Sequence, residues 1–222
     1  QFPDYLVCIP VDRNNTAENA ALMEMLSAGM PVKVLVQHDD LFEDGAIGQG
    51  SFAFGVRSAR LATTAMGLGG MFVMQSTSSN LYALRDRVRQ GMACRSPSLF
   101  SVFSGSPDSA TQLPPYLSAA AAMKSRAYPA FTYDANAGTN WATRFSLENN
   151  RNPDADWPVE EFEYADESVQ RVREQVRFTY ADFALGDQRH AHHFAVVPRE
   201  RWTAAMVPVA DWLALADADA AE

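Results

Sequence analysis

Cysteine is scarce in this 222-residue chain, and both basic runs and long apolar runs are missing. The two cysteines, Cys8 and Cys94, form no C-x-x-C pair. They cannot build a zinc or iron–sulfur site alone, because such sites need about four ligands. Two thiols in a chain of this length also do not indicate a disulfide scaffold, so we expect a reducing, cytoplasmic compartment.

Lysine and arginine form no cluster along the sequence, and the formal net charge is −9. Nucleic-acid binders usually carry a basic patch, so nucleic acid is not an expected partner. No segment approaches the roughly 20 apolar residues of a membrane span, and none has the pattern of a secretory signal. We therefore expect no membrane partner, and we interpret the acidity as a contribution to solubility.

Hydrophobic residues make up 47% of the chain, which suffices for one substantial core. Short apolar runs alternate with amphipathic segments. The runs predict strands at residues 5–10, 32–36, 71–74 and 98–103, with a further candidate at 129–133. Between them the pattern predicts helices at about 16–28, 52–66 and 78–90, and one that Pro114 and Pro115 open.

This alternation predicts an α/β fold with a mainly parallel sheet and helices on both faces, because parallel strands need crossover connections. We assign residues 1–135 to this domain and 136–222 to an irregular, helical C-terminal extension packed on it. In the extension we expect a charged helix at about 168–185, a strand at 190–197 and a helix at 202–215. The chain starts abruptly at Gln1, which processing or a cut within a longer polypeptide would explain equally well, and we expect a piece of a larger enzyme.

Acidic residues gather where the first two predicted strands end. Ligands of open parallel sheets bind beyond the carboxyl ends of the strands. The carboxylates at these ends are Asp12 after the first strand and Asp39, Asp40, Glu43 and Asp44 after the second. They suit one Mg²⁺ ion with a phosphate, which the glycine-rich residues 45–50 would let the backbone approach. The alternative is an ordinary acidic surface loop.

Three histidines stand close together late in the sequence. His190 and His192 would share one face of the expected strand, a spacing compatible with zinc, and His193 adjoins them. No cysteine or carboxylate at ligand spacing completes a set. We therefore expect surface or subunit-contact histidines.

Several segments carry a family resemblance. They are residues 22–29 (LMEMLSAG), 32–36 (VKVLV), 39–49 (DDLFEDGAIGQ), 60–67, 70–76 (GMFVMQS), 81–88, 97–103 (PSLFSVF) and 129–134 (PAFTYD). Their order and loop lengths resemble the C-terminal thiamine-diphosphate-binding domain of the pyruvate:ferredoxin (flavodoxin) oxidoreductase family. The match covers most of residues 15–135.

The resemblance implies a thiamine-diphosphate-binding fold and an oxidoreductase acting on 2-oxo acids such as pyruvate. It implies oxidative decarboxylation with thiamine diphosphate and Mg²⁺, and transfer of the acyl group to coenzyme A. Electrons would leave through iron–sulfur clusters elsewhere in the enzyme to ferredoxin or flavodoxin. The implied partners are the remaining domains or subunits, and we expect a homo-oligomer.

The resemblance also implies the site residues. Mg²⁺ would be held by Asp12, Asp39 and the main-chain carbonyl of Leu41, and Gly45 and Gly48 would join these in binding the cofactor. It assigns no catalytic residue to this chain, because the family's catalytic glutamate comes from another domain.

The sequence departs from the family at three places. Pro10-Val11-Asp12 stands where the family has G-D-G, the S-N-T-G-G-Q loop is largely rewritten, and Phe103-Ser104-Gly105 replaces a cluster cysteine. A second hypothesis is therefore a degenerate thiamine-fold domain acting as a structural or subunit-contact module. A third is a different Mg²⁺–phosphate enzyme, such as a phosphatase dependent on Asp12.

Overall fold

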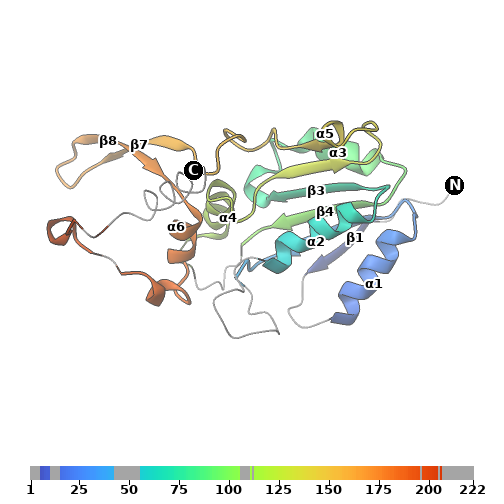
Figure 1. The fold of residues 1–222 in the computed structure, drawn as a ribbon, viewed down its shortest axis with the longest axis horizontal. Helices are drawn as coiled ribbons and strands as arrows, with labels where there is room; N and C mark the ends of the chain where they lie inside the picture. The colour runs from blue at the N-terminus through green and yellow to red at the C-terminus, as the bar shows by residue number, and fades with distance from the viewer. Residues whose placement is uncertain are drawn as a thin grey trace.

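Four parallel strands form the centre of the fold, and two antiparallel strands extend them at one edge (Figure 1). The computed structural model describes residues 6–10, 16–42, 56–105, 111, 113–195, 197–204 and 206. The sheet order is β1-β2-β4-β3-β5-β6. The strands are β1 (Leu6–Pro10), β2 (Lys33–His38), β3 (Phe72–Thr77), β4 (Ser98–Phe103), β5 (Phe131–Asp134) and β6 (Phe145–Ser146). The predicted α/β class with a mainly parallel sheet is confirmed, whereas the candidate fifth strand runs antiparallel to β3.

Helices cover both faces of this sheet. α1 (Thr16–Ser27) and α2 (Val56–Gly67) lie on one face, and α3 (Arg85–Ala93) packs on the other, after the 3-10 turn η1 (Ser78–Asn80). Crossovers between parallel strands are right-handed, so a connection that reverses direction along the sheet must change face. The chain moves outward from β1 to β2 to β3 and then returns through α3 to place β4 between β2 and β3. This return explains why α3 lies opposite α1 and α2.

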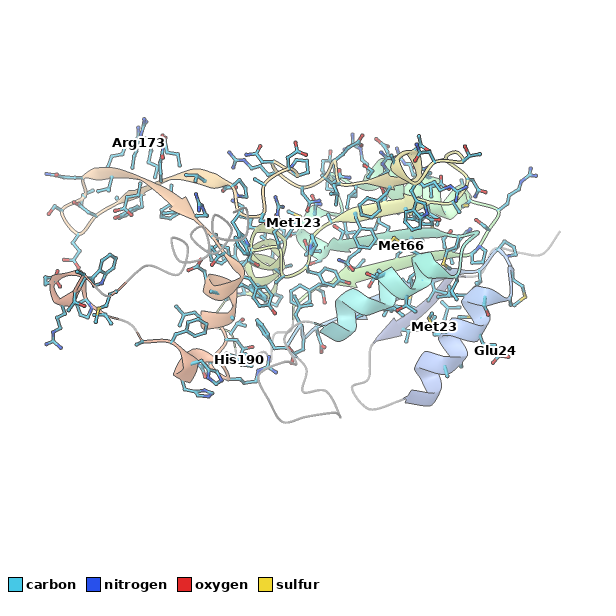
Figure 2. The ribbon with its side chains drawn as sticks, viewed as in Figure 1. Met23, Glu24, Met66, Met123, Arg173 and His190 are labelled. Carbon is cyan, nitrogen blue, oxygen red and sulfur yellow. The ribbon has the colours of Figure 1, made fainter. Side chains whose placement is uncertain are left out.

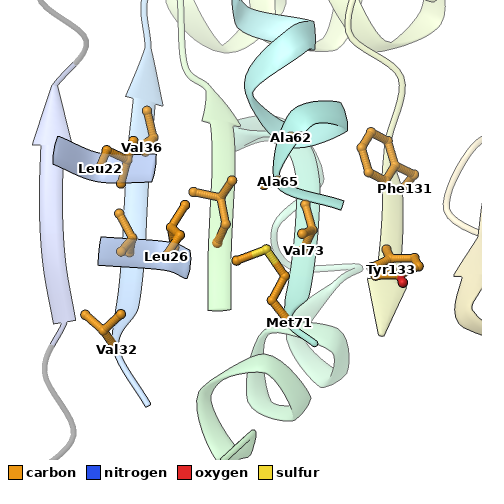
Figure 3. Close-up of a cluster of buried hydrophobic side chains, with 12 residues drawn as sticks. Leu22, Leu26, Val32, Val36, Ala62, Ala65, Met71, Val73, Phe131 and Tyr133 are labelled. Atoms are coloured by element: carbon orange, nitrogen blue, oxygen red, sulfur yellow. The ribbon is translucent and has the colours of Figure 1, made fainter. Parts of the chain in front are cut away.

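The core under α1 and α2 is built from side chains aligned across the strands (Figure 3). Val34, Leu99, Val73 and Tyr133 occupy the same register position on β2, β4, β3 and β5. Because both faces of β3 and β4 are covered, every residue of these two strands is buried. Their sequences therefore read as continuous apolar-rich runs instead of alternating ones.

On the opposite face α3 approaches the sheet closely at Gly91. A Cβ atom at this position would lie 2.5 Å from Phe72 Cε1 and 2.7 Å from Phe100 Cζ. Both rings are buried in the second core cluster, which also contains Met74 and Leu84. Glycine at this position therefore sets the distance between α3 and the sheet.

We expect Gly91→Ala to destabilise the chain by about 1–3 kcal/mol, because the added methyl group must displace two packed aromatic rings. Urea denaturation measures this change. Gly67→Ala is the control, since a Cβ at the end of α2 meets nothing within 4 Å. Equal stability of the two variants would contradict the close packing of α3.

A buried lysine holds the amino ends of β2 and β4 together. The Lys33 side chain is fully buried, and its Nζ donates hydrogen bonds to the main-chain oxygens of Cys94 and Ser96 and to Ser98 Oγ. A buried ammonium needs such acceptors, because an unpaired charge in a core is strongly unfavourable. The lysine in the predicted apolar run thus fixes the turn that precedes β4.

Beyond β6 the structure differs from the sequence-based expectation. Instead of one helix at 168–185, strands β7 (Val159–Ala165) and β8 (Arg171–Arg177) form an antiparallel hairpin, followed by the short helix α6 (Tyr180–Leu185). The hairpin turn forms because Asp166 Oδ1 accepts hydrogen bonds from the main-chain nitrogens of Ser168 and Gln170. The helix prediction was therefore wrong before residue 180.

The last described residues carry further corrections. The expected strand at 190–197 is absent from its described part, where η2 (Ala191–His193) forms a 3-10 turn. The expected helix at 202–215 is preceded by the 3-10 turn η3 (Arg199–Arg201), and Trp202 is not helical. The prediction of a helix opened by Pro114 and Pro115 is confirmed, because α4 (Pro115–Lys124) begins at Pro115. Residues 136–158 are mostly turns, apart from α5 (Trp141–Arg144) and β6. Among the described helices, none has the length and apolar character needed to cross a bilayer.

Candidate functional site at the carboxyl ends of the parallel strands

Polar side chains replace apolar ones toward the carboxyl ends of three adjacent strands. On the face covered by α1 and α2, His38 ends β2, Ser101 lies in β4 and Gln75 lies in β3. All three are buried, with exposed fractions of 2% or less. The same strands carry an apolar residue of the first core cluster two positions earlier (Val36, Leu99 and Val73). The change in character thus occurs within one sheet face, at the end where parallel sheets bind ligands.

Two of these groups, His38 and Ser101, form a hydrogen-bonded chain with Tyr128. His38 Nε2 lies 2.8 Å from Ser101 Oγ, and Ser101 Oγ lies 2.7 Å from the hydroxyl of Tyr128, which precedes β5. Tyr128 is fully buried, and burial raises the pKa of its hydroxyl. Burial lowers the pKa of His38 to about 4. The imidazole is therefore neutral at neutral pH, and so is the whole chain of groups.

Two buried polar atoms of this cluster have no hydrogen-bond partner. They are His38 Nδ1 and Gln75 Oε1. The orientation of the Gln75 amide is fixed because its Nε2 donates a 3.0 Å hydrogen bond to the Pro129 oxygen. Buried polar atoms in native proteins are nearly always paired with protein, water or ligand. The cluster is thus a position where a further polar group would be stabilised.

The loop after β2 brings a carboxylate to the same edge of the sheet. Asp39 is half-buried, and no described residue forms an ion pair with it. Asp40 Oδ1 accepts a 2.9 Å hydrogen bond from the main-chain nitrogen of Phe42, which closes a local turn. Leu41 and Phe42 are buried against α4 and α6. Of the two described aspartates in this loop, Asp39 is the one available to a cation.

Asp40 belongs instead to a network that the sequence analysis missed. Arg189 binds it through both terminal nitrogens, with Nη1–Oδ2 at 2.6 Å and Nη2–Oδ1 at 2.9 Å. The same guanidinium binds Asp187, with Nη2–Oδ2 at 2.6 Å. The hydrogen bonds that Arg189 donates to Asp40, and then those to Asp187, raise the pKa of Arg189. Burial opposes ionisation of Asp187, but the bonds from Arg189 outweigh it and lower the pKa of that carboxyl.

Within the described residues this network commits Asp40 to an ion pair with a residue of the C-terminal region. Asp40 and Arg189 are separated by 149 positions, so neither composition nor spacing signals the pairing. Asp40 is about nine-tenths buried and Asp187 is almost completely buried, and both carboxylates bind the same guanidinium. The structure thus gives Asp40 a structural contact, and its contribution to a cation site stays a prediction.

The structure places only part of the predicted site. Asp39 and Leu41 lie together at the end of β2. Asp12, Gly45 and Gly48, together with Glu43 and Asp44, fall outside the described residues. Within the described ranges, no three His, Cys, Asp or Glu side chains gather closely enough to hold a metal ion. The predicted Mg²⁺ set of Asp12, Asp39 and Leu41 stays a prediction.

The three late histidines lie after α6, where Figure 2 labels His190. The rings of His192 and His193 are 3.9 Å apart between centroids, and His190 packs edge-on against Phe42 at 4.8 Å. The strand that would have aligned His190 and His192 for zinc does not form, since Ala191–His193 is a 3-10 turn. His190 instead supports the position of the loop after β2.

Comparison with known proteins identifies no family for this chain. No protein-family model matches the sequence, and no curated protein matches it significantly.

Proposed function

We propose that the chain is the thiamine-diphosphate-binding part of a 2-oxoacid:ferredoxin or flavodoxin oxidoreductase. The observation that carries this proposal is the buried polar cluster of His38, Ser101 and Gln75 at the carboxyl ends of β2, β4 and β3. The connection after β2 passes to one face of the sheet and the connection after β3 passes to the other. Such a divergence creates the crevice in which open α/β sheets bind ligands.

The described groups fit the cofactor's Mg²⁺ and diphosphate. Asp39 offers a carboxylate without a competing ion pair among the described residues, and Leu41 offers a main-chain carbonyl next to it. Oxygen ligands of this kind, shared with phosphate oxygens, are what Mg²⁺ prefers. In the proposal Asp12 completes the set, and Gly45 and Gly48 let the backbone approach the diphosphate.

Thiamine diphosphate, when bound, supplies the electron sink for decarboxylation of a 2-oxo acid such as pyruvate. The chain's own contribution is binding and orientation. The neutral His38–Ser101–Tyr128 chain adds no charge beside the diphosphate, and buried side chains on both sheet faces keep water out of the strand ends. The proposed partners are the enzyme's other domains, with their iron–sulfur clusters, and coenzyme A, in a cytoplasmic homo-oligomer.

A second candidate is a structural or subunit-contact module without catalysis. The commitment of Asp40 to Arg189 favours it, because half of the described acidic loop then serves the fold. The replacement of the family's G-D-G by Pro10-Val11-Asp12, which removes both glycines and displaces the carboxylate by one position, favours it as well. On this alternative the polar cluster would hold buried water only.

Calorimetric titration of the full-length polypeptide with thiamine diphosphate and Mg²⁺ separates the two candidates. We expect binding in the wild type and a roughly 10- to 100-fold loss of affinity in Asp39→Ala, because the cation loses a carboxylate ligand. Asp86→Ala is the matched control, since Asp86 lies on α3 and its ion pair among the described residues is with the exposed Arg89. Absence of binding would exclude the thiamine-dependent proposal and favour the structural module.

A further inference from the structure

The hydrogen-bonded chain at the strand ends determines which nitrogen of His38 carries the proton. Ser101 has one hydroxyl hydrogen and lies within hydrogen-bond distance of both His38 Nε2 and the Tyr128 hydroxyl. If Ser101 donated to Tyr128, the Tyr128 hydrogen would need another acceptor. Among the described residues, Ser101 Oγ is the only hydrogen-bond partner of the fully buried Tyr128 hydroxyl. Tyr128 therefore donates to Ser101, because a buried hydroxyl without an acceptor is costly.

The direction of the rest of the chain follows. Ser101 accepts from Tyr128 and donates its own hydrogen to His38 Nε2, which must then be unprotonated. A neutral imidazole carries one hydrogen, so that hydrogen is on Nδ1. Nδ1 is bonded to Cγ and so lies on the main-chain side of the ring, at the end of β2. It is the buried atom without a partner.

We propose that the Nδ1–H group of His38 binds an anionic phosphate oxygen of the ligand at the carboxyl end of β2, which rests on the proposed function. An N–H donor cannot ligate a cation, and it needs an acceptor. Gln75 Oε1, two strands away on β3, is itself an acceptor and does not suit an anion. The diphosphate therefore belongs on the β2 side, where a cation at the adjacent Asp39 balances its charge.

Nitrogen NMR of the full-length polypeptide, labelled at its histidines, tests this inference without an activity assay. The chain has four histidines, so His190, His192 and His193 serve as internal references. We expect His38 to be in the Nδ1–H form in the free protein. Inorganic diphosphate with Mg²⁺ should shift the His38 Nδ1–H signals and leave the other three unchanged.

Two variants isolate the role of the chain. Ser101→Ala removes the donor to Nε2, so His38 should change to the Nε2–H form, and affinity for Mg²⁺-diphosphate should fall roughly threefold to tenfold. Ser104→Ala is the matched control, because Ser104 bonds the His38 main-chain oxygen and not the ring. It should leave the tautomer unchanged.

The possible outcomes are distinct. A wild-type His38 in the Nε2–H form, or His38 signals that diphosphate does not move, would overturn the inference even if thiamine diphosphate binds. If inorganic diphosphate shifts His38 while thiamine diphosphate fails to bind, the inference stands for a simple phosphate ligand and the proposed function falls.

Discussion

Replacing Arg189 by methionine is expected to destabilise the chain by about 3–5 kcal/mol, because it removes the guanidinium that two buried carboxylates share. Asp40 and Asp187 both accept hydrogen bonds from this one guanidinium. The side chains of the two aspartates are only 9% and 1% exposed, so water cannot replace the lost partner. Urea denaturation at pH 7 measures the loss.

Two comparisons make this prediction specific. Arg89→Met removes an exposed arginine paired with Asp86 and should cost about 1 kcal/mol or less. The triple variant Asp40→Asn, Asp187→Asn, Arg189→Met removes the charges together and should recover most of the stability, since uncharged groups are far less costly to bury. If Arg189→Met loses no more than Arg89→Met, the network does not stabilise the fold.

The stability of the chain is expected to fall by roughly 3 kcal/mol between pH 6.5 and pH 4 through His38 alone. Burial lowers the pKa of His38 from 6.5 to about 4 in the folded chain. Between these values the unfolded chain binds a proton that the folded chain does not bind, so unfolding becomes more favourable as pH falls. Above pH 6.5 both states hold a neutral imidazole, and this contribution does not change with pH.

The prediction is checked by the slope of unfolding free energy against pH. His38→Asn removes the titrating ring and should reduce the slope in this interval by about 1.4 kcal/mol per pH unit. His192→Asn, at an exposed position of the 3-10 turn, should keep the wild-type slope. Parallel slopes for wild type and His38→Asn would show that the folded chain protonates His38 readily.

The parallel sheet was predictable because its strands are short, apolar and separated by helices with recognisable ends. Every residue of β3 and β4 is buried. Strands buried on both faces are rich in apolar residues, and this is why the sequence shows apolar runs at these positions. The start of α4 could also be predicted from the local sequence, since Pro115 suits the first turn of a helix.

The hairpin was not predictable because its strands are almost fully exposed and carry helix-favouring residues. β8 reads RVREQVR, and arginine, glutamate and glutamine all favour helices. What makes it a strand is its pairing with β7, including bonds from Arg171 and Arg173 to Glu163 across the hairpin. Such contacts depend on the partner strand and leave only weak alternation in the sequence.

The candidate site also has a part that could be predicted from local sequence and a part that depends on distant residues. The position of Asp39 and Leu41 at a strand end could be predicted, because the carboxyl end of a strand is recognisable from the local sequence. The hydrogen bonds of His38 and Asp40 depend on Ser101, Tyr128 and Arg189, which arrive from later elements. Histidine at the end of an apolar run was the one signal that could have drawn attention to the cluster.

The contact between Asp40 and Arg189 also bears on how this sheet can be inherited or recombined. A polypeptide cut near residue 135 would keep every strand of the parallel sheet but would lose Arg189, which pairs with the buried Asp40. Exchanging the last third of the chain with another protein would therefore require a compensating change at Asp40, and the two positions should vary together in any lineage that retains this loop.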